Sequence, residues 1–130
     1  MMLVLGGNGQ VGRELRALAD ARGVRGVFRT RADVDVTDAR MVAQAVGEVR
    51  PTVVINLAAY NQVDRAEGDR DTARRVNALG PGIVADRAAA AGVPVIHVST
   101  DYVFDGEKGR AYVEGDSVGP LGVYGQTKEA

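Results

Sequence analysis

Short apolar runs alternate with longer amphipathic stretches along this chain of 130 residues. Runs rich in Val, Ile and Leu predict strands, whereas apolar residues spaced three and four apart predict helices. Strands are expected at 2–5, 24–29, 33–36, 52–57 and 93–99, and helices at about 12–22, 38–49, 69–91 and from 123 onward. Strands that alternate with helices in this way are typical of α/β proteins, in which crossover helices cover a parallel sheet.

Polar residues and prolines mark several of the expected helix ends. Thr37 or Asp38 is placed to cap the helix at 38–49, because either side chain can accept a hydrogen bond from the first helical turn. Pro51 stops that helix just before the next apolar strand. Pro81 interrupts the last long helical stretch, where it either kinks one helix or opens a second one.

A glycine-rich turn follows the first strand directly. Gly6, Gly9 and Gly12 match the spacing G-x-x-G-x-x-G, and Gly7 with the last two matches G-x-G-x-x-G. The first spacing is preferred because Gly6 comes immediately after the strand. A strand that turns through glycines into a helix directs backbone N–H groups and the positive helix end at one point, where a pyrophosphate binds. The turn predicts a dinucleotide site in a Rossmann-type doubly wound parallel sheet, with a plain structural turn as the alternative.

Residues after the next strands bear on the choice of dinucleotide. Arg29 and Arg31 follow the second strand, with no carboxylate between them. Two guanidinium groups at this position suit a 2′-phosphate, so NADPH is favoured over NADH, which stays open. The alternative is that both arginines are solvated loop charges. Further along, Asp35 and Val36 are placed to contact adenine, and the small side chains at 58–59 leave room for the cofactor's ribose and phosphate.

A hydroxyl and an amine later in the chain suit acid catalysis. Tyr124 can protonate a carbonyl oxygen that accepts hydride, and Lys128, four residues further along the same helix face, favours the phenolate. Thr100, at the end of the last expected strand, adds a hydroxyl that polarises the same oxygen. Only two of the 16 basic residues are lysine, so a lysine at this spacing is more than surface charge. An accidental match of the spacing is the alternative.

Other polar residues near the same edge of the sheet are weaker candidates. His97, the only histidine, alternates with apolar residues on the last strand, which indicates a packed strand residue rather than a catalytic base. Asp64, Asp101 and Asp105 fall in loops, where an aspartate more often caps its own backbone. Ser99 competes with the neighbouring threonine as the reacting hydroxyl.

Charge and composition narrow the class of protein further. The net charge is -1, so no global field draws the chain to nucleic acid or to an acidic membrane. There is no cysteine to form a disulfide or a thiolate metal site, and no metal centre is expected. The sequence shows neither a signal peptide nor an apolar run that could cross a bilayer, so a cytoplasmic protein is expected.

Several segments resemble the extended short-chain dehydrogenase/reductases. They are GGNGQVGREL at 6–15, DVTD at 35–38, RPTVVINLAAY at 50–60, VDRAE at 63–67, VNA at 76–78, STDYVFDG at 99–106 and PLGVYGQTK at 120–128. The resemblance covers essentially the whole chain, and the run at 99–106 is its most specific part. Within the family, the chain looks like the N-terminal part of the reductases that act on dTDP-linked 4-keto-6-deoxysugars.

The resemblance implies reduction of the 4-keto group of a dTDP-sugar by NAD(P)H, most closely dTDP-4-dehydro-L-rhamnose to dTDP-L-rhamnose. It assigns catalysis to Thr100, Tyr124 and Lys128, and substrate contacts to Thr100, Asp101 and Tyr102. Together with the reasoning above, the expected cofactor-binding residues are Gly6, Gly9, Gln10, Val11, Gly12, Arg29, Arg31, Asp35, Val36, Ala58, Ala59, Tyr60, Asn61, Tyr124 and Lys128. Glu14 matches a glutamate that binds magnesium in some relatives, at a site that later sequence would have to complete.

The resemblance also implies further strands and a C-terminal substrate-binding region that these 130 residues lack. Residues 1–130 are therefore expected to form one incomplete dinucleotide-binding domain, a sheet cut after its fifth strand, with weak or no turnover alone. Two alternatives stay open: a non-catalytic, cofactor-binding regulatory subunit, and a 4-ketoreductase for another nucleotide-linked deoxysugar. The free sheet edge leaves a homodimer open as well.

Overall fold

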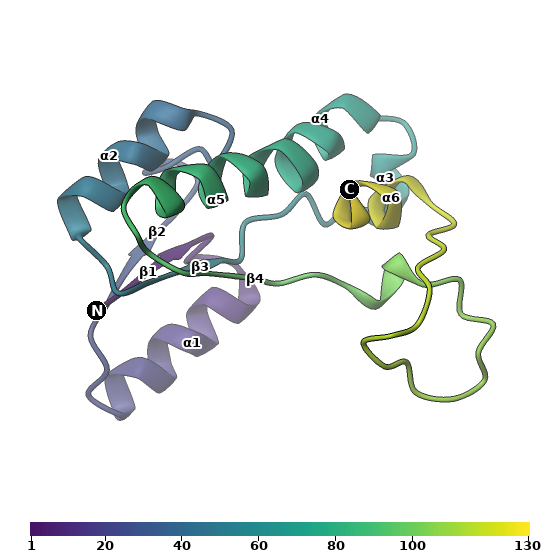
Figure 1. Ribbon diagram of the computed structural model, residues 1–130, viewed down its shortest axis with the longest axis horizontal. Coiled ribbons are helices and arrows are strands. Elements are labelled where there is room, and N and C mark those ends of the chain that lie inside the picture. The colour runs from purple at the N-terminus through teal and green to yellow at the C-terminus, as the bar shows by residue number, and fades with distance from the viewer.

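The computed structural model describes residues 1–130 and contains one parallel sheet of four strands (Figure 1). The strands are β1 (Met2–Leu5), β2 (Gly26–Arg29), β3 (Val53–Asn56) and β4 (Val95–His97). Their order across the sheet is β2-β1-β3-β4, so the chain passes from β2 over β1 to reach β3. This order, with a crossover helix in each connection, confirms the Rossmann-type doubly wound sheet.

Helices cover both faces of this sheet. α1 (Gln10–Ala21) lies on one face, and α2 (Ala39–Val49) with α5 (Gly80–Ala90) lies on the other (Figure 1). Asp38 caps α2, as expected, because its carboxylate accepts the N–H groups of the first turn. The shorter helical elements are α3 (Val63–Ala66), α4 (Arg70–Arg74), the π-helical turn η1 (Arg75–Leu79), the 3₁₀ turn η2 (Asp101–Val103) and α6 (Val123–Glu129).

The core follows from the apolar strands that the sequence predicts. All four residues of β1 are buried, because the strand has a neighbour on each side and helices above and below. Leu3 and Leu5 pack with α2 and α5 in the larger core cluster, and Met2 and Val4 pack with α1 in the smaller one. Full burial of each such side chain stabilises the fold by about 1.5–3 kcal/mol. β1 is therefore fixed at the centre of the sheet, and it holds the start of the glycine turn that follows it.

The expected strand at 33–36 does not form. Asp33 accepts hydrogen bonds from Thr30 and closes a turn, and the Asp35 carboxylate does the same with Thr37. These local bonds compete with sheet pairing, as aspartate side chains commonly do. The alternation of apolar and polar residues does mark the buried positions, because Val34 and Val36 lie in the larger core cluster. The sheet has four strands rather than five, and the last strand is shorter than the expected 93–99.

Pro81 opens a separate helix within the stretch expected to be helical at 69–91. α4, η1 and α5 follow one another directly, and Pro81 lies in the first turn of α5. The π-helical turn accommodates the proline, because a wider turn relieves the clash that its ring would make with the preceding carbonyl groups. The first residue of α5, Gly80, packs against Val36, where a Cβ would lie 3.0 Å from a methyl group. The second of the two alternatives for Pro81 is thus the one observed, with η1 as the joint.

Candidate active site

The glycine turn joins β1 to α1 at the carboxyl edge of the sheet. The N–H groups of Gly6 and Gly7 donate to the Arg29 carbonyl oxygen at 3.0 and 2.9 Å, which holds the turn against the end of β2. Gly6 has a φ of +83°, and a Cβ there would lie 2.8 Å from the Ala58 nitrogen. A Cβ on Gly12 would lie 2.7 Å from the Gly6 carbonyl oxygen. The turn therefore fits only glycines at both ends, and it brings bare backbone to the N-terminus of α1.

A groove of about 350 Å³ opens in front of this turn. Nine of the expected cofactor residues line it: Gly6, Gly9, Arg31, Asp35, Val36, Ala58, Ala59, Tyr60 and Asn61. Gln10 and Val11 are exposed in the first turn of α1, and Gly12 is buried behind the glycine turn. The groove therefore collects residues from three loops that each follow a strand, which the sequence could associate only through the parallel topology.

The two arginines near the end of β2 point to different places. Arg31 lines the groove, whereas the Arg29 guanidinium lies 3.9 Å from the Glu48 carboxylate on α2. Between them, the N–H and hydroxyl groups of Thr30 donate to Asp33 at 2.7 and 2.8 Å. These two hydrogen bonds hold the pKa of Asp33 below its ordinary value. Of the two arginines, only Arg31 therefore lines the groove.

Asp35 brings a negative charge to the same wall of the groove. Its carboxylate accepts from the N–H and the hydroxyl of Thr37 at 2.9 and 2.8 Å. These hydrogen bonds hold the pKa of Asp35 below its ordinary value, and the charges of Arg31 and Arg75 lower it further. Asp35 is therefore ionised at neutral pH, and its hydrogen bonds fix the loop that carries Val36.

Asn56, the last residue of β3, supports the opposite wall. Its side chain is fully buried, and its Oδ1 accepts the Ala58 N–H at 3.1 Å. Its Nδ2 is buried without a hydrogen-bond partner in the protein. The Oδ1 contact fixes the chain as it leaves β3 and enters the loop at 57–62 that lines the groove.

Helix α6 carries the predicted tyrosine and lysine one turn apart. The Tyr102 ring packs edge-on against the Tyr124 ring, with the centroids 5.5 Å apart. Gly125 makes this approach possible, because a Cβ there would overlap the Tyr102 carbonyl group and lie 3.0 Å from Pro120. α6 therefore packs directly on the backbone of η2.

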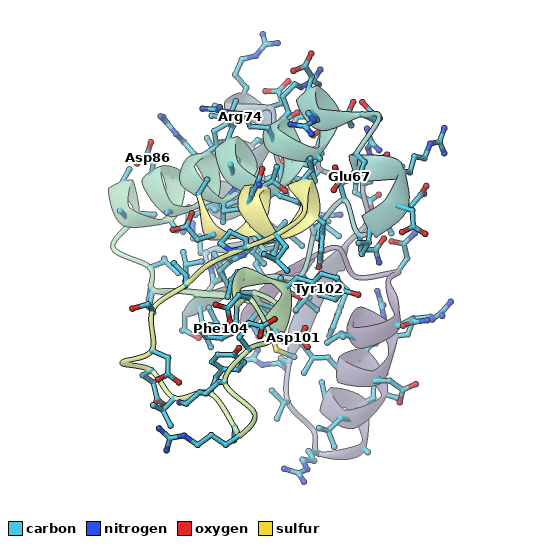
Figure 2. All side chains as sticks on the ribbon, turned by 90° about the vertical axis from the view of Figure 1, so that its right-hand side faces the viewer. Glu67, Arg74, Asp86, Asp101, Tyr102 and Phe104 are labelled. Atoms are coloured by element: carbon cyan, nitrogen blue, oxygen red, sulfur yellow. The ribbon has the colours of Figure 1, made fainter.

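Thr100 caps the start of η2. Asp101 and Tyr102, the next two residues, lie beside α6 (Figure 2). The Thr100 hydroxyl accepts the Tyr102 N–H and donates to the Asp101 carboxylate, each at 3.2 Å. Asp101 and Tyr102 are exposed, so they stay free to contact a molecule bound at this edge. The structure thus brings the predicted substrate residues next to the helix that carries Tyr124 and Lys128.

Lys128 is buried, with 8% of its surface exposed. Its ammonium group donates to the Val98 carbonyl oxygen at 2.7 Å and lies 3.1 Å from Nε2 of His97. Burial lowers the pKa of Lys128. Both contacts come from the segment at the end of β4, which sets the position of the lysine at the sheet edge.

Two residues without an assigned role hold α6 in place. Asn77, buried in η1, accepts the Tyr60 N–H at 2.8 Å and donates to the Tyr60 carbonyl and to the Thr127 hydroxyl, both at 3.0 Å. Glu67 accepts the Val123 N–H at 2.8 Å and so caps α6 across the fold. Asn77 therefore ties the wall of the groove to the tyrosine–lysine helix. Asn77 and Glu67 both lie in segments that carry the resemblance, VNA and VDRAE, which is the signal that could have found them.

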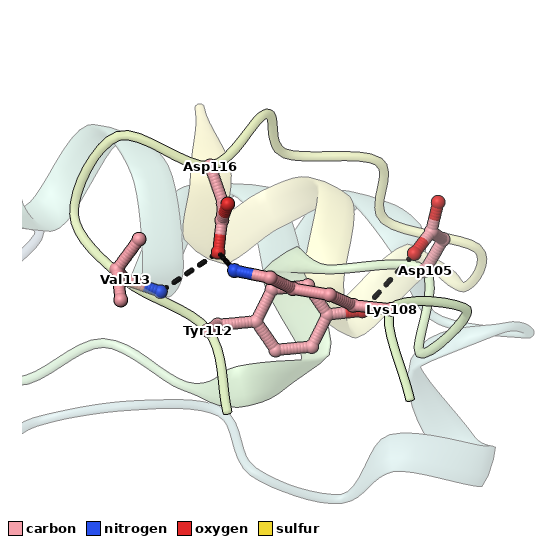
Figure 3. A network of polar contacts seen from close by, with 5 residues as sticks. All are labelled: Asp105, Lys108, Tyr112, Val113 and Asp116. Carbon is pink, nitrogen blue, oxygen red and sulfur yellow. Dashed lines mark hydrogen bonds and ion pairs between the residues drawn. The ribbon is translucent and has the colours of Figure 1, made fainter. Parts of the chain in front are cut away.

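The loop between η2 and α6 is held together by its own side chains (Figure 3). The ring of Tyr112 stacks on Phe104 with centroids 4.0 Å apart, and its hydroxyl donates to Asp105 at 3.1 Å. Lys108 pairs with Asp116, whose carboxylate also accepts the Val113 N–H at 2.7 Å. Hydrogen bonds from Lys108 and from the Val113 backbone hold the pKa of Asp116 below its ordinary value.

Two further expectations concern metals and membranes. Glu14 is exposed on α1, and no three His, Cys, Asp or Glu side chains gather closely enough to hold a metal ion. None of the helices has the length and apolar character needed to cross a bilayer.

The doubly wound sheet, the glycine turn and the groove beside it define a Rossmann-like α/β protein with a nucleotide-type cradle. The chain belongs to the family described as RmlD substrate binding domain, which matches residues 1–130.

Known proteins of this family resemble the whole chain. It is 45% identical over 128 residues to a dTDP-4-dehydrorhamnose reductase of Streptomyces griseus, covering 98% of this chain and 42% of that protein. It is 38% identical over 128 residues to a dTDP-4-keto-6-deoxy-D-glucose reductase of Streptomyces niveus, covering 98% and 44%. A crystal structure of dTDP-4-dehydrorhamnose reductase from Bacillus anthracis in complex with NADP superposes with a TM-score of 0.94 at 34% identity, over 98% of this chain and 46% of that one. The chain spans less than half of the length of each.

Proposed function

We propose that this chain is the cofactor-binding and catalytic part of an NAD(P)H-dependent reductase of dTDP-linked 4-keto-6-deoxysugars. The observation that carries the proposal is the groove at the glycine turn, whose far wall Asn77 joins to the helix with Tyr124 and Lys128. The names of the relatives support dTDP-4-dehydro-L-rhamnose as the first substrate to test. The Streptomyces niveus relative supports a second, dTDP-4-keto-6-deoxy-D-glucose.

The cradle fits a dinucleotide because its glycines leave no side chain between the turn and the N-terminus of α1. Backbone N–H groups at Gly9, Gln10 and Val11 would hold the pyrophosphate, where the helix dipole favours negative charge. Asp35 and Val36 would hold the adenine end, and the Arg31 guanidinium would pair with a 2′-phosphate. When bound, the reduced nicotinamide supplies hydride to the carbonyl carbon of the sugar.

The residues of the second half would handle the proton. The Tyr124 hydroxyl gives its proton to the oxygen of the 4-keto group as that oxygen becomes an alkoxide, and the Lys128 ammonium stabilises the phenolate that results. The Thr100 hydroxyl donates a hydrogen bond to the same oxygen. Asp101 and Tyr102, exposed beside Thr100, would contact the sugar. A positioned acid of this kind contributes about 10²–10⁴ in rate.

Residues 1–130 would then form the dinucleotide-binding domain, and the remainder of proteins like the relatives would supply most of the binding energy for the dTDP moiety. Remote binding energy of this kind is used to lower the barrier at the reacting centre, so the chain alone should turn over weakly.

The test is calorimetric binding of NADPH and of NADH to this chain, beside the variants Gly9→Asp and Gly9→Asn. Gly9 caps α1 without a side-chain hydrogen bond, so either residue improves the helix cap while only aspartate adds a charge. We expect saturable binding that Gly9→Asp abolishes and Gly9→Asn weakens less. Oxidation of NADPH followed at 340 nm with both keto sugars, in wild type and Tyr124→Phe, then tests the reaction. Binding of neither dinucleotide would refute the proposed function.

A further inference from the structure

Lys128 is a buried ammonium group without an acidic partner. Only 8% of the residue is exposed, and none of the ion pairs of the chain includes it. Its two contacts are the Val98 carbonyl oxygen at 2.7 Å and Nε2 of His97 at 3.1 Å. A buried cation is normally paired with an anion, whereas here only these two neutral groups stabilise the charge of Lys128.

The contact constrains the protonation state of His97 as long as Lys128 carries its charge. An ammonium group has only donors to offer, so Nε2 of His97 must accept, and the ring is neutral with its proton on Nδ1. A second positive charge on the exposed His97 ring, 3.1 Å away, would repel the buried ammonium group of Lys128. Consistently, the pKa of His97 lies below its ordinary value, first because of desolvation and then because of the charge of Lys128, with the Asn56 backbone opposing them.

No other charged group offsets this interaction. β3 has no ionisable side chain, and β4 has none besides His97. α5 packs near β4, but its Asp86 and Arg87 are exposed, and Asp86 points away from the sheet in Figure 2. On η2 and α6, Asp101 and Glu129 are also exposed, and Lys128 is the only charged side chain that shifts the pKa of His97.

We propose that His97 is a positioning residue for Lys128: its neutral imidazole holds the ammonium group beside Tyr124, and protonation of the ring displaces that group. The inference rests on the proposed function for its consequence, because Lys128 would meet the cofactor there. The sequence favoured a packed strand residue at 97, whereas the structure leaves His97 exposed on β4 and in contact with Lys128. It also makes the sheet edge sensitive to acid at a single group.

The contact itself is tested by NMR, since His97 is the only histidine in the chain. We expect the neutral ring of the wild type to show the Nδ1–H tautomer in nitrogen chemical shifts. The pKa of His97 should rise in Lys128→Met and stay unchanged in Lys108→Met, the matched control that removes the only other lysine. An Nε2–H tautomer in the wild type, or the same pKa in Lys128→Met, would overturn the proposal. The wild-type tautomer decides even if Lys128→Met fails to fold.

The consequence is tested by the affinity for NAD⁺ and NADP⁺, oxidised forms that tolerate acid, between pH 5 and 8. NAD⁺ lacks the 2′-phosphate, so its pH dependence reports on the protein alone. We expect wild-type affinity to fall toward acid by at most about tenfold per pH unit below the His97 transition. His97→Gln, which keeps an acceptor but cannot titrate, should lose this dependence, and His97→Leu should bind weakly throughout. An unchanged profile in His97→Gln would overturn the proposal. Absence of all binding would refute the proposed function and leave the NMR result to decide the contact.

Discussion

Gly125→Ala tests whether the close approach of α6 to η2 builds the candidate site. A Cβ at position 125 would lie 3.0 Å from the carbonyl carbon of Tyr102 and 3.0 Å from Cβ of Pro120, and would overlap the Tyr102 carbonyl oxygen. Carbon atoms in good contact are about 3.5–4.0 Å apart. Two of these contacts are with backbone, which cannot rotate away, so α6 or η2 must move.

The sign of the stability change distinguishes this reasoning from a simple helix effect. Alanine is favoured over glycine inside a helix by about 1 kcal/mol, whereas overpacking costs about 1–3 kcal/mol. Because the overlap is with backbone, we expect the upper part of that range and a net loss of about 1–2 kcal/mol. Gly47→Ala is the matched control, since a Cβ at that position in α2 meets nothing within 4 Å. It should stabilise the chain by about 1 kcal/mol.

The assay is urea denaturation of wild type, Gly125→Ala and Gly47→Ala, with the transition midpoints and slopes fitted together. Opposite shifts of the two variants are the expected result. If Gly125→Ala is as stable as Gly47→Ala, the packing of α6 on η2 is not as close as described. The shifted helix should also weaken catalysis in any active longer protein, because a displacement of about 1 Å costs about 10²-fold in rate.

Three further predictions concern single side chains. Asn77→Ala should lower the free energy of unfolding by about 2–4 kcal/mol, since it leaves buried partners unpaired, whereas Asn61→Ala in the exposed loop should change it little; urea denaturation checks both. Arg31→Ala should reduce the preference for NADPH over NADH by about tenfold or more in calorimetry, and Arg29→Ala, which loses only its Glu48 contact, should not. The pKa of Asp35 is lowered in the folded chain, so its carboxylate stabilises the fold fully above the pKa of the unfolded state, and this stabilisation is lost as the pH falls through the pKa of the folded state. In Asp35→Asn, the urea midpoint should therefore depend less on pH in the acidic range.

The sequence predicts the apolar strands and the glycine turn because each depends on residues close together in the chain. β1 is uniformly apolar, and Gly6 follows it directly, so strand and turn are local signals. The prediction of a strand at 33–36 was wrong, and the reason is equally local. Its Val-Asp-Val pattern alternates like a strand, but hydrogen bonds from Thr30 and Thr37 fold it into turns, and burial of the two valines does not require pairing.

The parts that escaped prediction depend on long-range contacts. Asn77 meets Thr127 across 50 residues, and Glu67 meets Val123 across 56, so no window of the sequence relates them. The different directions of Arg29 and Arg31 depend on where Glu48 lies after α2 has packed. The assignments of Thr100, Tyr124 and Lys128 remain predictions, although their elements adjoin. Spacing alone indicated the tyrosine–lysine pair, whereas the contact of Lys128 with His97 required the fold.

The loop from Asp105 to Asp116 has a consequence for how the chain folds. Thr100 and Tyr124 lie 24 positions apart, and bringing their segments together costs conformational entropy of the chain between them. The entropy of closing such a loop grows with its length, by about 0.6 kcal/mol for each doubling. Stacking of Tyr112 on Phe104 and pairing of Lys108 with Asp116 tie up about half of this stretch by contacts within it. Once formed, this loop shortens the effective tether, so that the two ends search a smaller volume before α6 docks.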